Sequence, residues 1–99
     1  MTPVTTATLD AALADRSVVL DFTAPWCTAC KALLPTLLEF EKTHAVPVLS
    51  VDVDDWPEVA ERFGVLGLPT VLRVDRGRVT ARHTGAGRRT ALEALFTGR

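Results

Sequence analysis

The sequence lacks the features that mark several classes of protein. It has only two cysteines in 99 residues, too few for the multi-disulfide framework of a small secreted protein. Its apolar runs are far shorter than the roughly 20 residues that a membrane-spanning helix needs, and no charged segment followed by a long apolar stretch opens the chain. The formal net charge is −1, without the basic excess that neutralises phosphates. We therefore expect a cytoplasmic protein that binds neither membranes nor nucleic acid.

What the sequence has is the balance of a packed globule. Hydrophobic residues make up 47% of the chain and charged residues 23%, and the length of 99 residues leaves room for one core. We expect a single domain over 1–99. Charge is uneven, because 7 Lys and Arg stand against 2 Asp and Glu from Thr70 onward. These arginines are either solvated charges that protect an outer strand from pairing with other chains or a patch that docks a partner.

Periodicity predicts alternating strands and helices. Apolar and β-branched runs predict strands near residue 4 and at 17–23, 46–53, 70–74 and 78–83. Helical spacing predicts helices at 8–13 with Thr8 as N-cap, at 27–43, at 57–62 and after Gly87. Strands that alternate with helices in this way indicate an α/β fold.

The two cysteines are the residues best suited to carry chemistry. Cys27 and Cys30 stand three apart at the predicted start of a helix, so both sulfurs lie on one face within reach of a disulfide. Unpaired N–H groups and the helix dipole at that end favour negative charge and raise the thiolate fraction of a thiol. We therefore interpret Cys27, beside the turn at Pro25 and Trp26, as the attacking thiolate and Cys30 as the resolving thiol.

Two alternatives remain for the cysteine pair. Free cysteines are often buried and inert, so the pair could be two small core residues. A C-x-x-C motif that follows a strand and opens a helix favours redox chemistry instead. A structural zinc ion needs two more ligands, and the only histidines, His44 and His83, lie in different elements. We therefore expect no metal.

Asp21 and Pro69 also stand out. Asp21 interrupts the apolar strand Val18–Phe22, where burial raises the pKa of a carboxyl and suits it to proton transfer. Asp21 faces water if the strand alternates, but the apolar residues on both sides favour burial. Pro69 lies between a turn and a strand, where a cis bond would hold a tight turn, although only about one in twenty X-Pro bonds is cis.

Four segments together resemble the thioredoxin family over nearly the whole chain. They are Val18–Phe22, Trp26-Cys27-x-x-Cys30-Lys31, Pro35 and Gly67-Leu68-Pro69-Thr70. The resemblance implies a thioredoxin fold, a central mixed sheet of five strands flanked by four helices, in which the third strand lies between the first and the second, and the fourth and fifth follow the second. It also implies a cis bond before Pro69 and an Asp21 that takes or relays the proton of Cys30. The substrate-binding residues would be Trp26, Pro25, Leu68, Pro69 and Gly85.

The resemblance further implies a protein-disulfide reductase that cycles between a Cys27/Cys30 dithiol and disulfide. We expect a monomer without a cofactor, which acts on disulfide-containing proteins and is recharged by a flavoprotein thioredoxin reductase. Typical members have Gly-Pro where this chain has Thr28-Ala29, Trp in place of Thr23 and often Lys in place of Ser50. The dipeptide tunes the redox potential. A dedicated thiol oxidoreductase or isomerase for one partner, and a non-catalytic docking module, therefore remain as alternatives.

Overall fold

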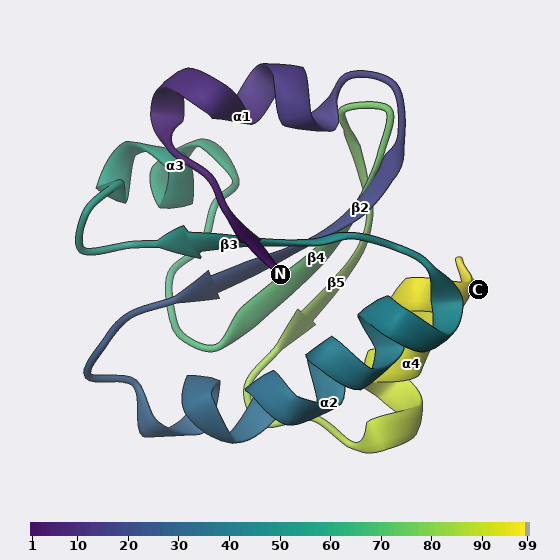
Figure 1. The fold of residues 1–99 in the computed structure, drawn as a ribbon. Helices are drawn as coiled ribbons and strands as arrows, with labels where there is room; N and C mark the ends of the chain where they lie inside the picture. The colour runs from purple at the N-terminus through teal and green to yellow at the C-terminus, as the bar shows by residue number, and fades with distance from the viewer. Residues whose placement is uncertain (99) are drawn as a thin grey trace.

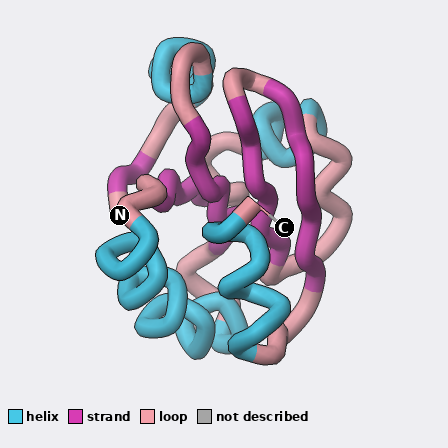
Figure 2. Tube along the Cα trace, turned by 90° about the vertical axis from the view of Figure 1, so that its right-hand side faces the viewer, coloured by secondary structure: helices cyan, strands magenta, loops and turns pink. Residues whose placement is uncertain are grey.

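The computed structural model describes residues 1–98, which form a mixed sheet of five strands between two pairs of helices (Figures 1 and 2). The strands are β1 (Thr2–Pro3), β2 (Ser17–Thr23), β3 (Val48–Asp52), β4 (Thr70–Asp75) and β5 (Arg78–Thr84). The helices are α1 (Thr6–Leu13), α2 (Thr28–His44), α3 (Pro57–Arg62) and α4 (Arg89–Thr97). The predicted order of elements and the α/β fold class are confirmed.

The sheet has the strand order β1-β3-β2-β4-β5, as the family resemblance implies. β3 runs parallel to β1 and β2, whereas β4 runs antiparallel to β2 and β5. Figures 1 and 2 show α1 and α3 on one face of the sheet and α2 and α4 on the other. The central strand β2 is therefore covered on both faces, and its residues 18–22 are all buried.

Two apolar clusters lie on the two faces of the sheet. The first includes Leu9 of α1 and Phe22 of β2, and the second includes Val19 of β2 and Leu37 of α2. Because successive side chains of a strand point to opposite faces, β2 contributes to both clusters. Packing on both sides holds β2 in place and so fixes the point at which the chain leaves its carboxyl end.

The first helix begins earlier than the threonine pattern predicts. Thr5, and not Thr8, is the N-cap: Thr5 Oγ1 accepts from Thr8 N at 3.3 Å, and Thr8 Oγ1 accepts from Thr5 N at 2.9 Å. Thr8 is thus the N3 residue of a capping box whose N-cap is Thr5. The prediction of Thr8 as N-cap is wrong because several threonines in succession offer similar caps. The strand predicted at 46–53 is also shorter, since β3 covers only Val48–Asp52.

Arginines of the C-terminal third have structural roles. Arg73 has a side chain only 13% exposed, and its Nη1 donates to the Leu95 carbonyl at 2.7 Å while its Nε donates to Asp75. Arg82 Nη2 donates to the Phe63 carbonyl at 2.6 Å, just beyond the end of α3. The expectation of freely solvated charges is therefore wrong for Arg73. β5, at the edge of the sheet, is the predicted outer strand.

Candidate active site

The cysteine motif lies where β2 ends and the longest helix begins. After Thr23 the chain turns, and Cys27 takes the N-cap position of α2 with an extended backbone, φ −85° and ψ 98°. Cys27 N donates to the Ala24 carbonyl at 3.1 Å, and the Cys27 carbonyl accepts from Lys31 N at 3.2 Å. Backbone hydrogen bonds on both sides thus hold Cys27 between strand and helix.

Cys27 and Cys30 form a disulfide, with their Cα atoms 5.3 Å apart. Cys27 is 6% exposed and Cys30 is 3% exposed. The two pack with Ala24, Val53 and Leu68 in a small apolar cluster. Because disulfides generally span Cα separations of roughly 4.4–6.8 Å, this geometry lets the bond open and close without a large movement of the backbone.

The start of α2 gives the two sulfurs different surroundings. Cys27 Sγ accepts a hydrogen bond from Cys30 N at 3.2 Å, whereas Cys30 Sγ lies 4.0 Å from the Phe22 carbonyl oxygen. The free N–H groups and the dipole of a helix start favour negative charge, and no acidic residue stands in the first turn to oppose it. This environment accommodates negative charge better at Cys27 Sγ than at Cys30 Sγ.

Asp21 is buried in the middle of β2, as its apolar neighbours predict. It is 2% exposed and lies beside Ser50 of β3 and Val71 of β4. Within residues 1–98 its Oδ1 has no hydrogen-bond partner. Desolvation by burial raises the pKa of the Asp21 carboxyl from 3.8 to about 6. The alternative in which Asp21 faces water is therefore wrong, and this carboxyl can take up or release a proton near neutral pH.

A second loop reaches the cysteines from the other side. The Leu68–Pro69 peptide bond is cis, as the family resemblance implies, and Leu68 packs on the cysteine cluster. Gly85 N donates to the Pro69 carbonyl at 2.8 Å, and Gly85 has φ 81°, a left-handed conformation that suits glycine. Thr70 Oγ1 donates to the Gly67 carbonyl at 2.7 Å. The Gly85–Pro69 hydrogen bond ties the loop before β4 to the turn after β5, and the Thr70–Gly67 hydrogen bond closes that loop locally.

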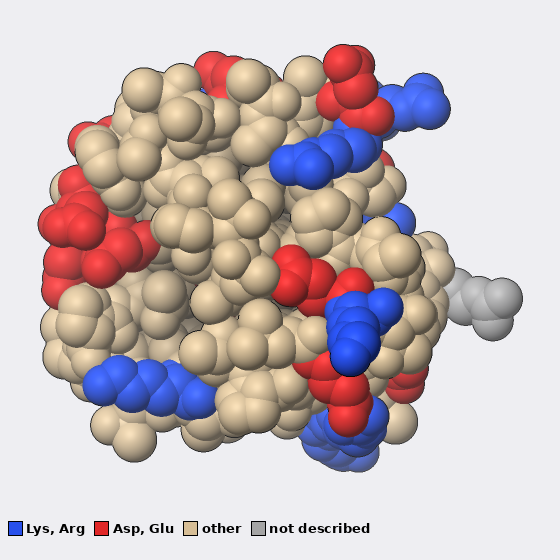
Figure 3. Space-filling view, in the orientation of Figure 1, with Lys and Arg blue, Asp and Glu red and all other residues tan. Residues whose placement is uncertain are grey.

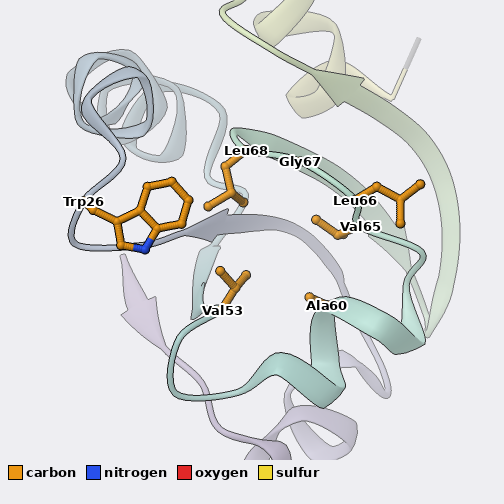
Figure 4. A pocket seen from close by; sticks show the side chains of 7 residues that line it. All are labelled: Trp26, Val53, Ala60, Val65, Leu66, Gly67 and Leu68. Atoms are coloured by element: carbon orange, nitrogen blue, oxygen red, sulfur yellow. The ribbon is translucent and has the colours of Figure 1, made fainter.

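An apolar groove of about 210 Å³ lies between the cysteine turn and α3 (Figure 4). Its lining residues are Trp26, Val53, Ala60, Val65, Leu66, Gly67 and Leu68. Of the five predicted substrate-binding residues, Trp26 and Leu68 line it and Pro25 is exposed next to Trp26. Pro69 and Gly85 are outside this lining and are hydrogen-bonded to each other through their backbones.

Sequence reasoning missed the α3 side of the apolar groove. Ala60, Val65 and Leu66 were not among the predicted binding residues, yet they line it. Leu66 is fully exposed, at 101%. The one signal for it in the sequence is the apolar run Val65-Leu66 within a turn, where polar residues are the rule.

Comparison with known proteins identifies the family. The family profile described as Thioredoxin matches residues 1–97. The chain belongs to the thioredoxin family. A thioredoxin of Alicyclobacillus acidocaldarius subsp. acidocaldarius is 37% identical over 82 residues, which cover 81% of this thioredoxin-family chain and 78% of that protein. The solved structure of Plasmodium falciparum thioredoxin matches with a TM-score of 0.91 and 31% identity, over 99% of this chain and 98% of that one.

A further relative carries a thioredoxin segment within a larger protein. The bifunctional thioredoxin reductase/thioredoxin of Mycobacterium leprae (strain TN) is 35% identical over 85 residues. These residues cover 84% of this thioredoxin-family chain but only 19% of that protein. The similarity therefore concerns one part of that relative.

The family and the cysteine geometry agree on the chemistry. This thioredoxin-family protein is a disulfide-reducing thiol-disulfide oxidoreductase, with Cys27 and Cys30 as its redox-active pair. Two inert core cysteines are thereby excluded. Across residues 1–98, no group of three or more His, Cys, Asp or Glu is placed to hold a metal ion. Nor do the helices of that range include one that is long and apolar enough to cross a membrane.

Proposed function

We propose that the chain reduces protein disulfides with Cys27 as the attacking thiolate and Cys30 as the resolving thiol. The observation that carries the proposal is the place of Cys27 at the N-cap of α2, where its sulfur accepts the N–H of Cys30. Its neighbour Trp26 lines the apolar groove, so a bound segment there lies beside the sulfur. Cys30 is the more deeply buried of the two and is suited to the second, internal attack.

The proposed cycle has two exchange steps. The Cys27 thiolate attacks one sulfur of the substrate disulfide, that S–S bond breaks, and the other substrate sulfur leaves and takes a proton from water. Cys30 then gives up its proton and attacks Cys27 Sγ. This attack breaks the mixed disulfide, releases the second substrate thiolate and closes the Cys27–Cys30 disulfide. The substrate gains the two electrons that the protein loses.

Asp21 is the proposed acceptor of the Cys30 proton. It precedes Phe22, whose carbonyl oxygen lies 4.0 Å from Cys30 Sγ. Burial raises the pKa of its carboxyl to about 6, and a base with a pKa near the working pH can both accept and return a proton. Because Cys30 is only 3% exposed, bulk water has little access to its thiol.

The proposed binding surface for an extended substrate segment consists of Trp26, Pro25, Leu68, Pro69 and Gly85. Its support is the position of Trp26 and Leu68 in the groove lining and the contact of Leu68 with the cysteines. The hydrogen bond from Gly85 N to the Pro69 carbonyl holds the loop that presents the backbone of Leu68.

The proposed partners are disulfide-containing proteins as electron acceptors and a flavoprotein thioredoxin reductase as electron donor. The Mycobacterium leprae relative supports the second, because its description joins a thioredoxin reductase and a thioredoxin in one protein. After each cycle this thioredoxin-family chain has to be returned to its Cys27/Cys30 dithiol, which a reducing cytosol supports. We therefore propose that the protein is cytoplasmic. We also propose that it acts as a monomer, which sedimentation of the reduced protein tests.

Trapping with Cys30→Ser tests the assigned roles. This variant should hold insulin as a mixed disulfide on Cys27 that dithiothreitol releases, whereas the matched variant Cys27→Ser should form no adduct. With dithiothreitol as electron source, the wild type should reduce insulin faster than Cys27→Ser. Equal rates would contradict the proposed activity, and an adduct on Cys27→Ser alone would reverse the two roles.

The second candidate is a dedicated oxidoreductase or isomerase for one partner. Thr28 and Ala29, both exposed between the cysteines, favour it because this dipeptide tunes the potential. A change of about 30 mV corresponds to about 1.4 kcal/mol for a two-electron couple, so small differences redirect electron flow. A reduction potential and reductase kinetics equal to those of thioredoxins with Gly-Pro would remove this candidate.

A further inference from the structure

The exposed indole of Trp26 is held in place by one carboxylate. Trp26 Nε1 donates to Asp54 Oδ2 at 3.0 Å and to Asp54 Oδ1 at 3.2 Å, although the residue is 66% exposed. Asp54 is itself positioned after β3, because its N–H donates to Asp52 Oδ1 at 2.9 Å. The contact therefore links the cysteine turn to the connection between β3 and α3.

The Trp26 ring is one end wall of the apolar groove. Figure 4 shows Trp26 at one end and Leu66 at the other, with Val53 and Leu68 between them. The lining includes no charged side chain. A cavity of about 150 Å³ is large enough for a benzene ring, so the groove, at about 210 Å³, accommodates one large aliphatic or aromatic side chain.

Carboxylates without cationic partners stand beside the groove. Residues 52–61 contain no Lys or Arg and hold the acidic residues Asp52, Asp54, Asp55, Glu58 and Glu61. Figure 3 shows acidic side chains gathered at the left edge of this face, over the connection between β3 and α3. Within the described residues 1–98, neither Asp54 nor Asp55 forms an ion pair, whereas Asp10, Glu39 and Asp75 each pair with an arginine.

We propose that Asp54 determines substrate specificity, in that it holds the Trp26 wall and presents a free negative charge beside the groove. The preferred substrate is then a disulfide whose attacked cysteine is flanked by a large apolar side chain for the groove and by a Lys or Arg for Asp54. The inference rests on the proposed attack by Cys27. Trp26 directly precedes Cys27, so a segment that fills the groove lies next to that sulfur.

Asp54 can perform both tasks at once. An ionised carboxylate has about four acceptor positions, and the indole N–H occupies only part of them. An ammonium or guanidinium group of the substrate can approach the remaining positions, because Asp54 is exposed. An exposed pair of this kind changes kcat/KM by only about threefold to fivefold, acts mainly on association, and is screened by salt.

Short peptide disulfides that differ at one flanking position test the inference. Each peptide carries a leucine beside the attacked cysteine, followed by Lys, Gln or Glu. With the wild type we expect kcat/KM to decrease in the order Lys, Gln, Glu, by about threefold to fivefold per step at about 0.05 M salt. At about 1 M salt the order should disappear. A fourth peptide with Ser in place of Leu measures the contribution of the groove.

Three variants separate the two tasks of Asp54. Asp54→Asn removes the charge but keeps an acceptor for the indole, so it should lose the Lys-to-Glu order and keep the preference for leucine. Asp54→Ala removes both and should weaken both preferences. Trp26 fluorescence, recorded with Trp56→Phe as background, should stay near that of the parent in Asp54→Asn and change in Asp54→Ala. Asp15→Asn, which removes an exposed carboxylate outside the 52–61 segment, should keep both preferences.

The outcomes distinguish this inference from the proposed function. Equal rates for the Lys and Glu peptides with the wild type, or an order that survives in Asp54→Asn, would overturn the inference and leave the reductase activity in place. If no peptide disulfide is reduced by the wild type, the attack by Cys27 is itself contradicted.

Discussion

Among single residues, Asp21 has a carboxyl whose pKa is raised by burial. The pKa of its carboxyl is raised from 3.8 to about 6 by burial, so the folded protein holds this proton more tightly than the unfolded chain does. As the pH rises between these values, the unfolded chain ionises first and the folded state loses stability. Above about pH 6 the loss is complete and amounts to about 3 kcal/mol.

Asp21→Asn, which cannot ionise, should lack this pH dependence. The free energy of unfolding of the wild type minus that of Asp21→Asn should fall by about 3 kcal/mol from about pH 3 to about pH 7. Urea unfolding of the two oxidised proteins at several pH values measures it. Asp15→Asn, which changes an exposed carboxyl, serves as control. A difference that stays constant with pH would contradict a raised pKa for Asp21.

The surroundings of some of these residues could be predicted from the sequence, whereas those of others could not. A carboxyl inside an apolar run is a local signal, and it correctly predicts that Asp21 is buried. Trp26 and Asp54 are 28 residues apart, and each by itself has the pattern of an ordinary surface residue. Their contact depends on how β3 and the turn after β2 lie in the sheet, which no local pattern contains.

Among the elements, three strands meet at one carboxylate, that of Asp75. It accepts from Arg73 Nε at 3.1 Å, from Ser17 Oγ of β2 and from Thr80 Oγ1 of β5 at 2.5 Å. Hydrogen bonds from Arg73, Ser17 and Thr80 lower the pKa of the Asp75 carboxyl from 3.8 to about 2. Arg73 also reaches the Leu95 carbonyl, so the contact extends to the last turn of α4.

Asp75→Asn should lower the free energy of unfolding by about 1 kcal/mol at about pH 6. The side chain is 32% exposed, so solvent screening keeps the effect below what the lowered pKa alone would imply. Because the pKa of Asp75 is lowered, its stabilisation is present above pH 3.8 and is lost as the pH falls through about 2. Denaturant unfolding should therefore show a difference that shrinks between about pH 4 and about pH 2.

The surface pair of Asp10 and Arg62 is the matched control for Asp75. Its atoms lie 2.9 Å apart, but the Asp10 side chain is 80% exposed. Asp10→Asn should therefore change stability little, since exposed ion pairs contribute about 0–1 kcal/mol. An equal loss in both variants would mean that the hydrogen bonds of Asp75 to three elements add nothing.

Element boundaries were predictable where the chemistry is unambiguous. The two strands of the hairpin were expected at 70–74 and 78–83, and Arg76 and Gly77 between them have φ values of 50° and 82°, the left-handed conformations of a tight two-residue turn. The start of α1 was not, because Thr5 and Thr8 are both good caps and only packing selects between them. Local signals thus locate an element better than they choose among equivalent ends.

In the whole molecule, the sheet joins the two apolar clusters into one core. β2 supplies Phe22 to the first and Val19 to the second, and β4 supplies Leu72 to the first and Val71 to the second. Periodicity alone did not reveal which strands are neighbours, because β3 pairs with β1 and β2 across long stretches of chain. The strand order came from the family resemblance, which carries long-range information that a local pattern lacks.

Because both clusters share β2 and β4, we expect the chain to unfold as one cooperative unit, in keeping with the proposed single domain. Leu9→Ala in the first cluster and Leu37→Ala in the second each remove a fully buried side chain and should cost about 2–5 kcal/mol. Each variant should shift the unfolding of both layers equally.

Trp56 emission, recorded with Trp26→Phe as background, reports on the first cluster, against which Trp56 packs, and far-UV circular dichroism reports on all helices. The two midpoints should coincide in this background and in both variants made in it, with calorimetric and van't Hoff enthalpies equal. If Leu37→Ala moved the helical signal and left Trp56 unchanged, the two layers would unfold independently and the single-domain proposal would be wrong.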